Sequence, residues 1–109
     1  MADLGIETRD ESDVGVIALS GEFDLAGVQD FERELAKLEA GGANVLLVDM
    51  SGLRFMDSSG LRALVMADQR AKKAGRRLAI VPGPTAVRRV FEITQLDDRL
   101  DLIESVSAL

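Results

Sequence analysis

The sequence predicts an α/β fold, with a mixed, mostly parallel β-sheet, an N-terminal β-hairpin and helices packed on the sheet. Three observations lead to this prediction. The chain opens with two strand-like segments around a polar turn, strand and helix patterns alternate after that, and glycine or proline marks most of the changes. Alternating strands and helices imply parallel pairing through right-handed crossovers. The length of 109 residues suits a single domain over residues 1–109.

The hairpin comes first. Leu4, Ile6 and Thr8 alternate with Gly5, Glu7 and Arg9, which is the period of a half-buried strand. The polar run 10–13 is typical of a turn, and the apolar segment 14–19 predicts the second strand.

A first helix follows, with Asp24 as its N-cap and Gly41-Gly42 at its end. One face of this helix carries Val28, Phe31, Leu35 and Leu38. Next, the uninterrupted apolar run 45–48 predicts a strand buried on both faces.

A second helix is predicted over about 59–74, with Gly75 ending it, and a further strand ends at Val81. Pro82-Gly83-Pro84 forces a turn, and a short third helix starts near Pro84 and reaches Thr94. The tail predicts a short strand over about 100–103 and then a last helical turn.

Composition excludes several classes of function. The chain has no Cys and no His, so thiol chemistry, disulfides and histidine-based catalysis or metal binding are excluded. A net charge of −6 and only four aromatic residues, all Phe, argue against direct nucleic-acid binding. No apolar run is long enough to insert into a membrane, and the acidic N-terminus does not look like a secretory signal. We expect a cytoplasmic protein that is not an enzyme and needs no cofactor.

The segment "FMDSSGLRAL", residues 55–64, allows two interpretations. Asp and Ser are preferred N-caps, so the segment can be a helix start. A hydroxyl at a helix N-terminus is also a favourable place for an added phosphate, although Asp57 opposes that charge. A nucleophilic serine is excluded, because the G-x-S-x-G pattern and a base are both missing, and no GK[ST] phosphate loop exists.

The longer stretch "VDMSGLRFMDSSGLRAL", residues 48–64, resembles the signature of STAS domains of the anti-sigma factor antagonist type. "LSGEFDLAG", residues 19–27, and "VRRVFEITQLDDRLDLIES", residues 87–105, resemble two further segments of that family. Phe23 and Gln95 depart from it. Gln95 stands where Gly is common, so Gln must occupy a turn that Gly enters easily.

The resemblance implies a bacterial partner-switching protein. By motif position, Ser58 would be phosphorylated by a serine kinase of the histidine-kinase-like ATPase fold that is also the anti-sigma factor. The unphosphorylated protein would bind this partner and free the sigma factor, and a metal-dependent serine phosphatase would reverse the modification. An alternative is a non-phosphorylated STAS subunit of a membrane lipid or anion transport system.

Around Ser58 we expect a partner-binding surface. Its candidate residues are Asp24, Met56, Asp57, Ser58, Ser59, Gly60 and Leu61. For several of them a structural role competes: N-capping for Asp24, helix packing for Gly60, and the core for Met56 and Leu61. Asp24 and Asp49 each end a strand pattern, and parallel strands would bring Asp24 to the edge that carries Ser58.

Overall fold

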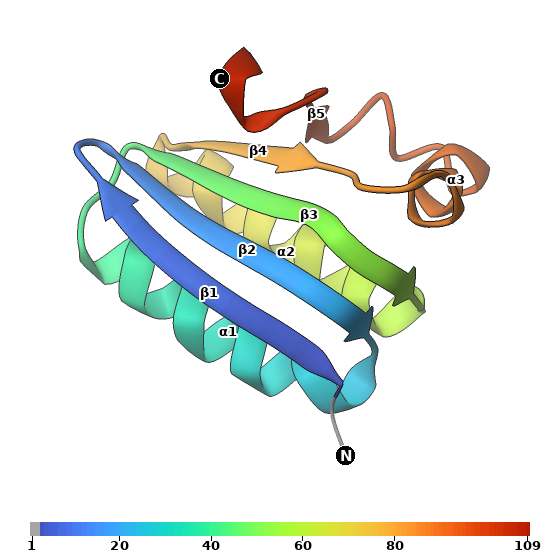
Figure 1. The fold of residues 1–109 in the computed structure, drawn as a ribbon. Coiled ribbons are helices and arrows are strands. Elements are labelled where there is room, and N and C mark those ends of the chain that lie inside the picture. Colours follow the sequence, from blue (N-terminus) through green and yellow to red (C-terminus); the bar gives the residue numbers. More distant parts are fainter. Residues whose placement is uncertain (1–2) are drawn as a thin grey trace.

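The computed structural model describes residues 3–109, so residues 1 and 2 of the expected domain lie outside the described part. Five strands form one sheet in the order β1-β2-β3-β4-β5. β1 and β2 pair antiparallel, and all other neighbours pair parallel, which confirms the predicted mixed α/β fold (Figure 1). The elements are β1 Leu4–Glu11, β2 Val14–Phe23, α1 Leu25–Ala40, β3 Val45–Met56, α2 Ser58–Ala74, β4 Arg77–Val81, α3 Thr85–Ile93, β5 Asp101–Leu102 and the 3₁₀ turn η1 Val106–Ala108.

Both hairpin strands are longer than the sequence pattern predicts. β1 pairs in register from Leu4 opposite Gly21 to Glu11 opposite Val14, so the turn shrinks to Ser12 and Asp13. Ser12 adopts a φ of 54° there. β2 continues past Leu19 because its backbone still pairs with β3, even though the side chains become small or polar and the ladder shifts register twice.

β3 also runs further than expected. The apolar run 45–48 is its buried part, but pairing continues through Ser20 opposite Gly52 to Phe23 opposite Met56. Asp49 therefore lies inside β3, and the expectation that it ends a strand is wrong. Its carboxylate accepts a hydrogen bond from the Ser51 amide at 3.0 Å. Sequence alone does not reveal that β2 supplies a backbone partner for β3 beyond Asp49.

The main core lies between the sheet and helices α1 and α2, which cover one face of β1–β4 (Figure 1). Phe23, at the end of β2, and Phe31 of α1 pack in this layer with their ring centroids 5.0 Å apart. At the outer side, Arg70 of α2 donates to Glu32 at 3.1 Å and Glu39 at 3.2 Å, both on α1. The two helices are thus tied to each other as well as to the sheet.

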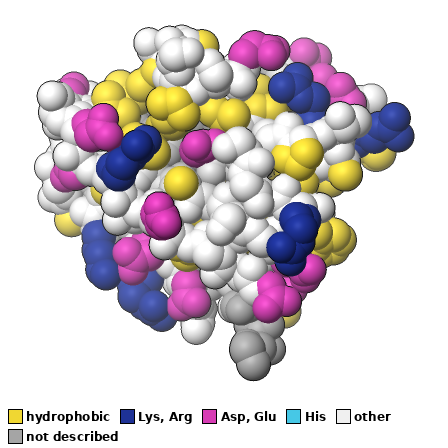
Figure 2. Space-filling view, viewed as in Figure 1, with side chains coloured by type: hydrophobic (Ala, Val, Ile, Leu, Met, Phe, Trp, Pro, Cys, Tyr) yellow, Lys and Arg dark blue, Asp and Glu magenta, His cyan; other side chains and the backbone are white. Residues whose placement is uncertain are grey.

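The opposite face of the sheet carries a smaller cluster of Val16, Leu47, Ala79 and Val81, against which Ile103 packs. These residues alternate along their strands with core residues, as the period of two requires. Figure 2 looks onto this face and shows acidic and basic side chains spread among small residues and backbone. Among residues 3–109, no helix covers β1–β3 on this side (Figure 1).

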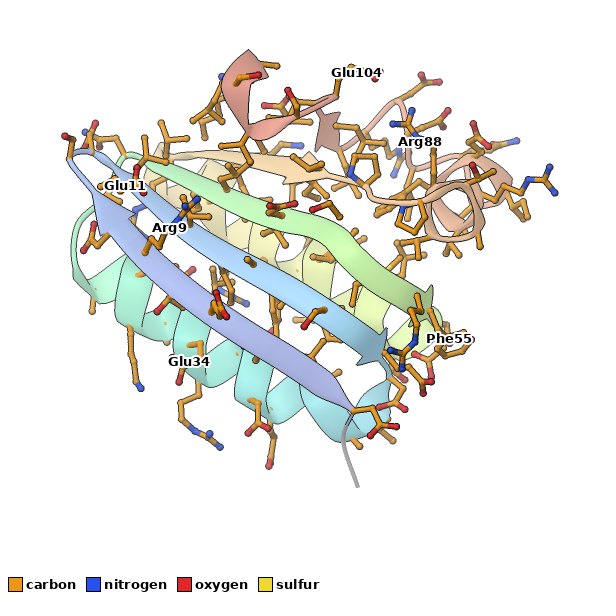
Figure 3. All side chains as sticks on the ribbon, in the orientation of Figure 1. Arg9, Glu11, Glu34, Phe55, Arg88 and Glu104 are labelled. Carbon is orange, nitrogen blue, oxygen red and sulfur yellow. The ribbon has the colours of Figure 1, made fainter. Side chains whose placement is uncertain are left out.

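The C-terminal part matches the predicted helix, strand and turn closely. Leu100 is buried and anchors the segment between α3 and β5. Arg77 of β4 and Asp101 of β5 form an ion pair at 2.7 Å, and this hydrogen bond and charge raise the pKa of Arg77. Arg88 and Glu104 join α3 to the tail at 4.0 Å (Figure 3). Gln95 has a φ of 60°, so the turn does require the conformation that Gly enters easily.

Within residues 3–109, none of the helices has the length and apolar character needed to cross a membrane.

Candidate functional site

The carboxyl ends of β2 and β3 lie side by side and carry the start of both helices. Phe23 and Met56 are register partners, and the amide of Asp57 donates to the carbonyl of Phe23 at 3.2 Å. Asp24 and Asp57 are the next residue of each strand, so they are neighbours at one edge of the sheet. The expectation that Asp24 and Ser58 share this edge is confirmed, because Asp24 and Asp57 follow paired strand ends and Ser58 comes next in the chain. Figure 1 shows the ends of β2 and β3 at this edge.

Both aspartates are N-caps. Asp24 Oδ1 accepts from the Ala26 amide at 3.1 Å, and Asp57 Oδ1 accepts from the amides of Ser59 at 2.9 Å and Gly60 at 3.2 Å. The N-cap interpretation of the "DSSG" segment is therefore confirmed with Asp57 in that role. α2 begins at Ser58, one residue earlier than predicted. Neither serine hydroxyl is needed to cap the helix.

Ser58 occupies the first position of α2 and is exposed, whereas Ser59 and Asp57 are half-buried. In the part of the chain that the structure describes, no hydrogen bond holds the Ser58 hydroxyl. Modification of the Ser58 hydroxyl therefore breaks no hydrogen bond of the fold. The position also lies at the positive end of the α2 dipole, next to two carboxylates that repel an added negative charge.

Three of the predicted residues lie in the core. Met56 and Leu61 are 4% and 7% exposed. A Cβ on Gly60 would lie 2.8 Å from the Phe23 carbonyl oxygen and 2.9 Å from Phe23 Cγ, so glycine lets α2 start close against β2. The packing and core alternatives therefore hold for these residues. The exposed or half-exposed members of the set are Asp24, Asp57, Ser58 and Ser59.

Sequence reasoning missed the apolar surface around this edge. Leu25, directly after its cap, is 74% exposed, and Phe55 and Met66 are about half exposed. Figure 3 shows Phe55 projecting outward from the end of β3. A groove between α1 and α2 is lined by Leu25, Val28, Glu32, Ser59, Arg62, Ala63 and Met66. The helical period could have revealed this surface, because Leu25 and Met66 lie outside the apolar stripes of their helices and are therefore predicted to be exposed.

The chemistry at this edge is that of a binding surface. It presents one free hydroxyl, two half-buried carboxylates, exposed apolar side chains and the cation of Arg62. Among residues 3–109, no group of three or more His, Cys, Asp or Glu side chains is arranged to hold a metal ion.

Comparison with known proteins identifies the family. Residues 6–104 match the model of the family described as "Mlab, STAS domain". The chain belongs to the STAS domain family. The match begins within β1 and covers the remaining strands and helices through β5, including the edge that carries Ser58.

Three named proteins are similar to this chain over almost its whole length. The anti-sigma-B factor antagonist of Staphylococcus aureus is 28% identical over 102 residues, which is 94% of each chain. The crystal structure of an anti-sigma factor antagonist from Mycobacterium paratuberculosis has a TM-score of 0.89 and 24% identity, covering 97% of this chain and 90% of that one. The phosphorylated form of the Bacillus cell fate determinant SpoIIAA has a TM-score of 0.73 and 20% identity, covering 95% and 96%. These structures share the fold of this STAS domain.

Proposed function

We propose that this STAS domain is an anti-sigma factor antagonist whose binding is switched off by phosphorylation of Ser58. The observation that carries the proposal is the free, exposed hydroxyl at the first position of α2, at an edge where two helices begin together. The names of the S. aureus and M. paratuberculosis relatives support an antagonist, and the existence of a phosphorylated SpoIIAA supports the modification.

The switch acts through local electrostatics. A phosphate on Ser58 adds about −1.5 to −2 charges at pH 7, next to Asp57 and near Asp24. A partner that buries this edge would have to desolvate those charges without a cation to balance them, which costs several kcal/mol. A loss of ~3 kcal/mol already weakens binding more than a hundredfold. The partner is excluded without any rearrangement of the fold.

Two features of the structure support a switch that leaves the fold intact. The cap of α2 is Asp57, so phosphorylation of Ser58 breaks no hydrogen bond that starts the helix. The side chains beneath it, Met56 and Leu61, are packed in the core and hold the first turn in place.

The partner in this proposal is the anti-sigma factor, a serine kinase of the histidine-kinase-like ATPase fold. A metal-dependent serine phosphatase restores the binding form. Both partners follow from the family resemblance of the "FMDSSGL" segment. The alternative is a STAS subunit of a membrane lipid or anion transport system, in which Ser58 remains unmodified and the same edge docks permanently.

A labelling experiment separates these two functions. The protein is incubated with ATP and the candidate anti-sigma kinase from the same genome, and the product is mapped by mass spectrometry. Ser58→Ala is compared with Ser59→Ala, a matched loss of the adjacent hydroxyl. We expect one phosphate in the wild type and in Ser59→Ala, and none in Ser58→Ala.

Full labelling of Ser58→Ala would remove Ser58 from the mechanism. Absence of both binding to the kinase and phosphate transfer from ATP would favour the non-phosphorylated subunit of a transport system instead.

A further inference from the structure

We propose that Arg62 is the intramolecular counter-ion of phosphorylated Ser58, so that modification also withdraws a free cation from the docking edge. The biological meaning of this inference rests on the proposed function of Ser58. The pairing itself involves only the first two turns of α2 and can be measured without a partner protein.

The spacing brings the two side chains together. Ser58 and Arg62 are four residues apart in one helix, both are exposed, and Cβ atoms at this spacing are about 5–6 Å apart. Side chains in a helix lean toward its N-terminus, so Arg62 leans toward Ser58. An anion that precedes a cation by four residues is also the favourable order in a helix.

Arg62 is available for this role. Two other basic residues of α2 are engaged: Arg70 with Glu32 and Glu39, and Lys72 of the last turn with Asp68 at 3.0 Å. Within residues 3–109, Arg62 has no carboxylate partner. Glu32, the carboxylate that shares the groove with Arg62, is already paired with Arg70.

The helix N-terminus alone does not satisfy a phosphate here. Asp57 Oδ1 already takes the amides of Ser59 and Gly60, and the Leu61 amide donates to the Asp57 carbonyl at 3.1 Å. The charged groups around Ser58 are Asp57 and Asp24 at the two helix starts, the Arg54–Glu22 pair at 3.6 Å on the adjoining strands, and Arg62. Of these cations, only Arg62 has no carboxylate partner in the part of the chain that the structure describes.

This arrangement gives the switch two parts. In the unphosphorylated protein, Arg62 lines the groove beside Leu25 and Met66, where it favours an acidic group of a partner. In the phosphorylated protein, the guanidinium pairs with the phosphate, and the edge loses that cation while it gains negative charge. Arginine suits the role because its planar fork binds phosphate oxygens in a bidentate manner.

The test uses full-length protein with phosphoserine installed at position 58 by codon reassignment, so that no kinase or partner is needed. The ³¹P resonance of the phosphate is titrated against pH in the wild type, Arg62→Gln and Arg62→Lys. Arg89→Gln is the matched control, because it removes one exposed positive charge from α3. We expect the titration midpoint of Arg62→Gln to rise by about 0.4 pH unit, because the dianion loses its nearest cation. Arg62→Lys should fall between Arg62→Gln and the wild type.

A midpoint in Arg62→Gln equal to that in Arg89→Gln would overturn the inference. The thermal midpoints of the unphosphorylated variants check that each one folds. Failure of the proposed function is a separate result: the partner would then bind phosphorylated and unphosphorylated protein equally, whatever the ³¹P titration gives.

Discussion

The N-termini of α1 and α2 are built alike and differ at their first two helical residues, Leu25-Ala26 in α1 and Ser58-Ser59 in α2. Each helix follows a strand end, is capped by an aspartate, and has glycine at its third residue: Asp24 and Gly27 in α1, Asp57 and Gly60 in α2. The first residue is Leu25 in one helix and Ser58 in the other, and both side chains point into solvent.

The comparison teaches that the scaffold and the function of this edge are separable. The caps and glycines fix where each helix starts and how closely it approaches the sheet. The first helical residue contributes little to the fold and is free to serve binding. In α1 it offers an exposed apolar side chain, and in α2 it offers a hydroxyl that can be charged.

The largest expected effect comes from the glycines, which are similar in sequence but not in surroundings. At Gly60 an added Cβ meets the Phe23 backbone at 2.8 Å, whereas at Gly27 it meets the Leu4 side chain at 2.9 Å. A side chain can move and a paired strand cannot. Gly60→Ala should therefore lower the free energy of unfolding by about 2 kcal/mol, and Gly27→Ala by less than about 1 kcal/mol. Urea denaturation measures both, and equal losses would contradict the comparison.

The caps come next. Asp57 accepts from two amides and is half-buried, and Asp24 accepts from one. Asp57→Ala should cost about 1.5 kcal/mol of unfolding free energy and Asp24→Ala about 1 kcal/mol. The corresponding Asn variants keep the acceptor oxygen and should recover most of each loss. A larger loss at Asp24 would show that the two helix starts do not depend on their caps as described.

Leu25 tests the first helical residue of α1. Because it is 74% exposed, Leu25→Ser should change the free energy of unfolding by less than about 0.5 kcal/mol. If the anti-sigma partner covers this edge, the same variant should bind about tenfold more weakly, since burial of a leucine contributes about 1.5 kcal/mol or more. Val106→Ser, in the C-terminal 3₁₀ turn, is the control for an exposed apolar residue elsewhere. Equal affinity of both variants would place the docking surface away from Leu25.

Much of this architecture could be predicted from the sequence. The period of Val28, Phe31, Leu35 and Leu38 defines α1, and the stop at Gly75 defines the end of α2, because these signals are local. The strand ends were less predictable. Ser20 to Phe23 and Ser51 to Met56 lack a continuous apolar pattern, and they are strands because each supplies the other's backbone partners.

The candidate site divides in the same way. Asp24, Asp57 and Ser58 could be placed at one edge from motif and topology. The identity of the α2 cap, the burial of Met56 and Leu61, and the exposed Leu25 depend on how the helices sit against the sheet. A linear pattern assigns apolar residues to the core by default. It therefore does not predict that a leucine close to Ser58 in the fold is exposed.

The affinity of the anti-sigma kinase for this protein with and without phosphate on Ser58 tests the central claim most directly. Isothermal titration calorimetry with the phosphoserine protein and its unmodified counterpart measures both values under the same conditions. The account predicts a loss of at least a hundredfold on phosphorylation, with the fold unchanged by circular dichroism. Equal affinities would contradict it.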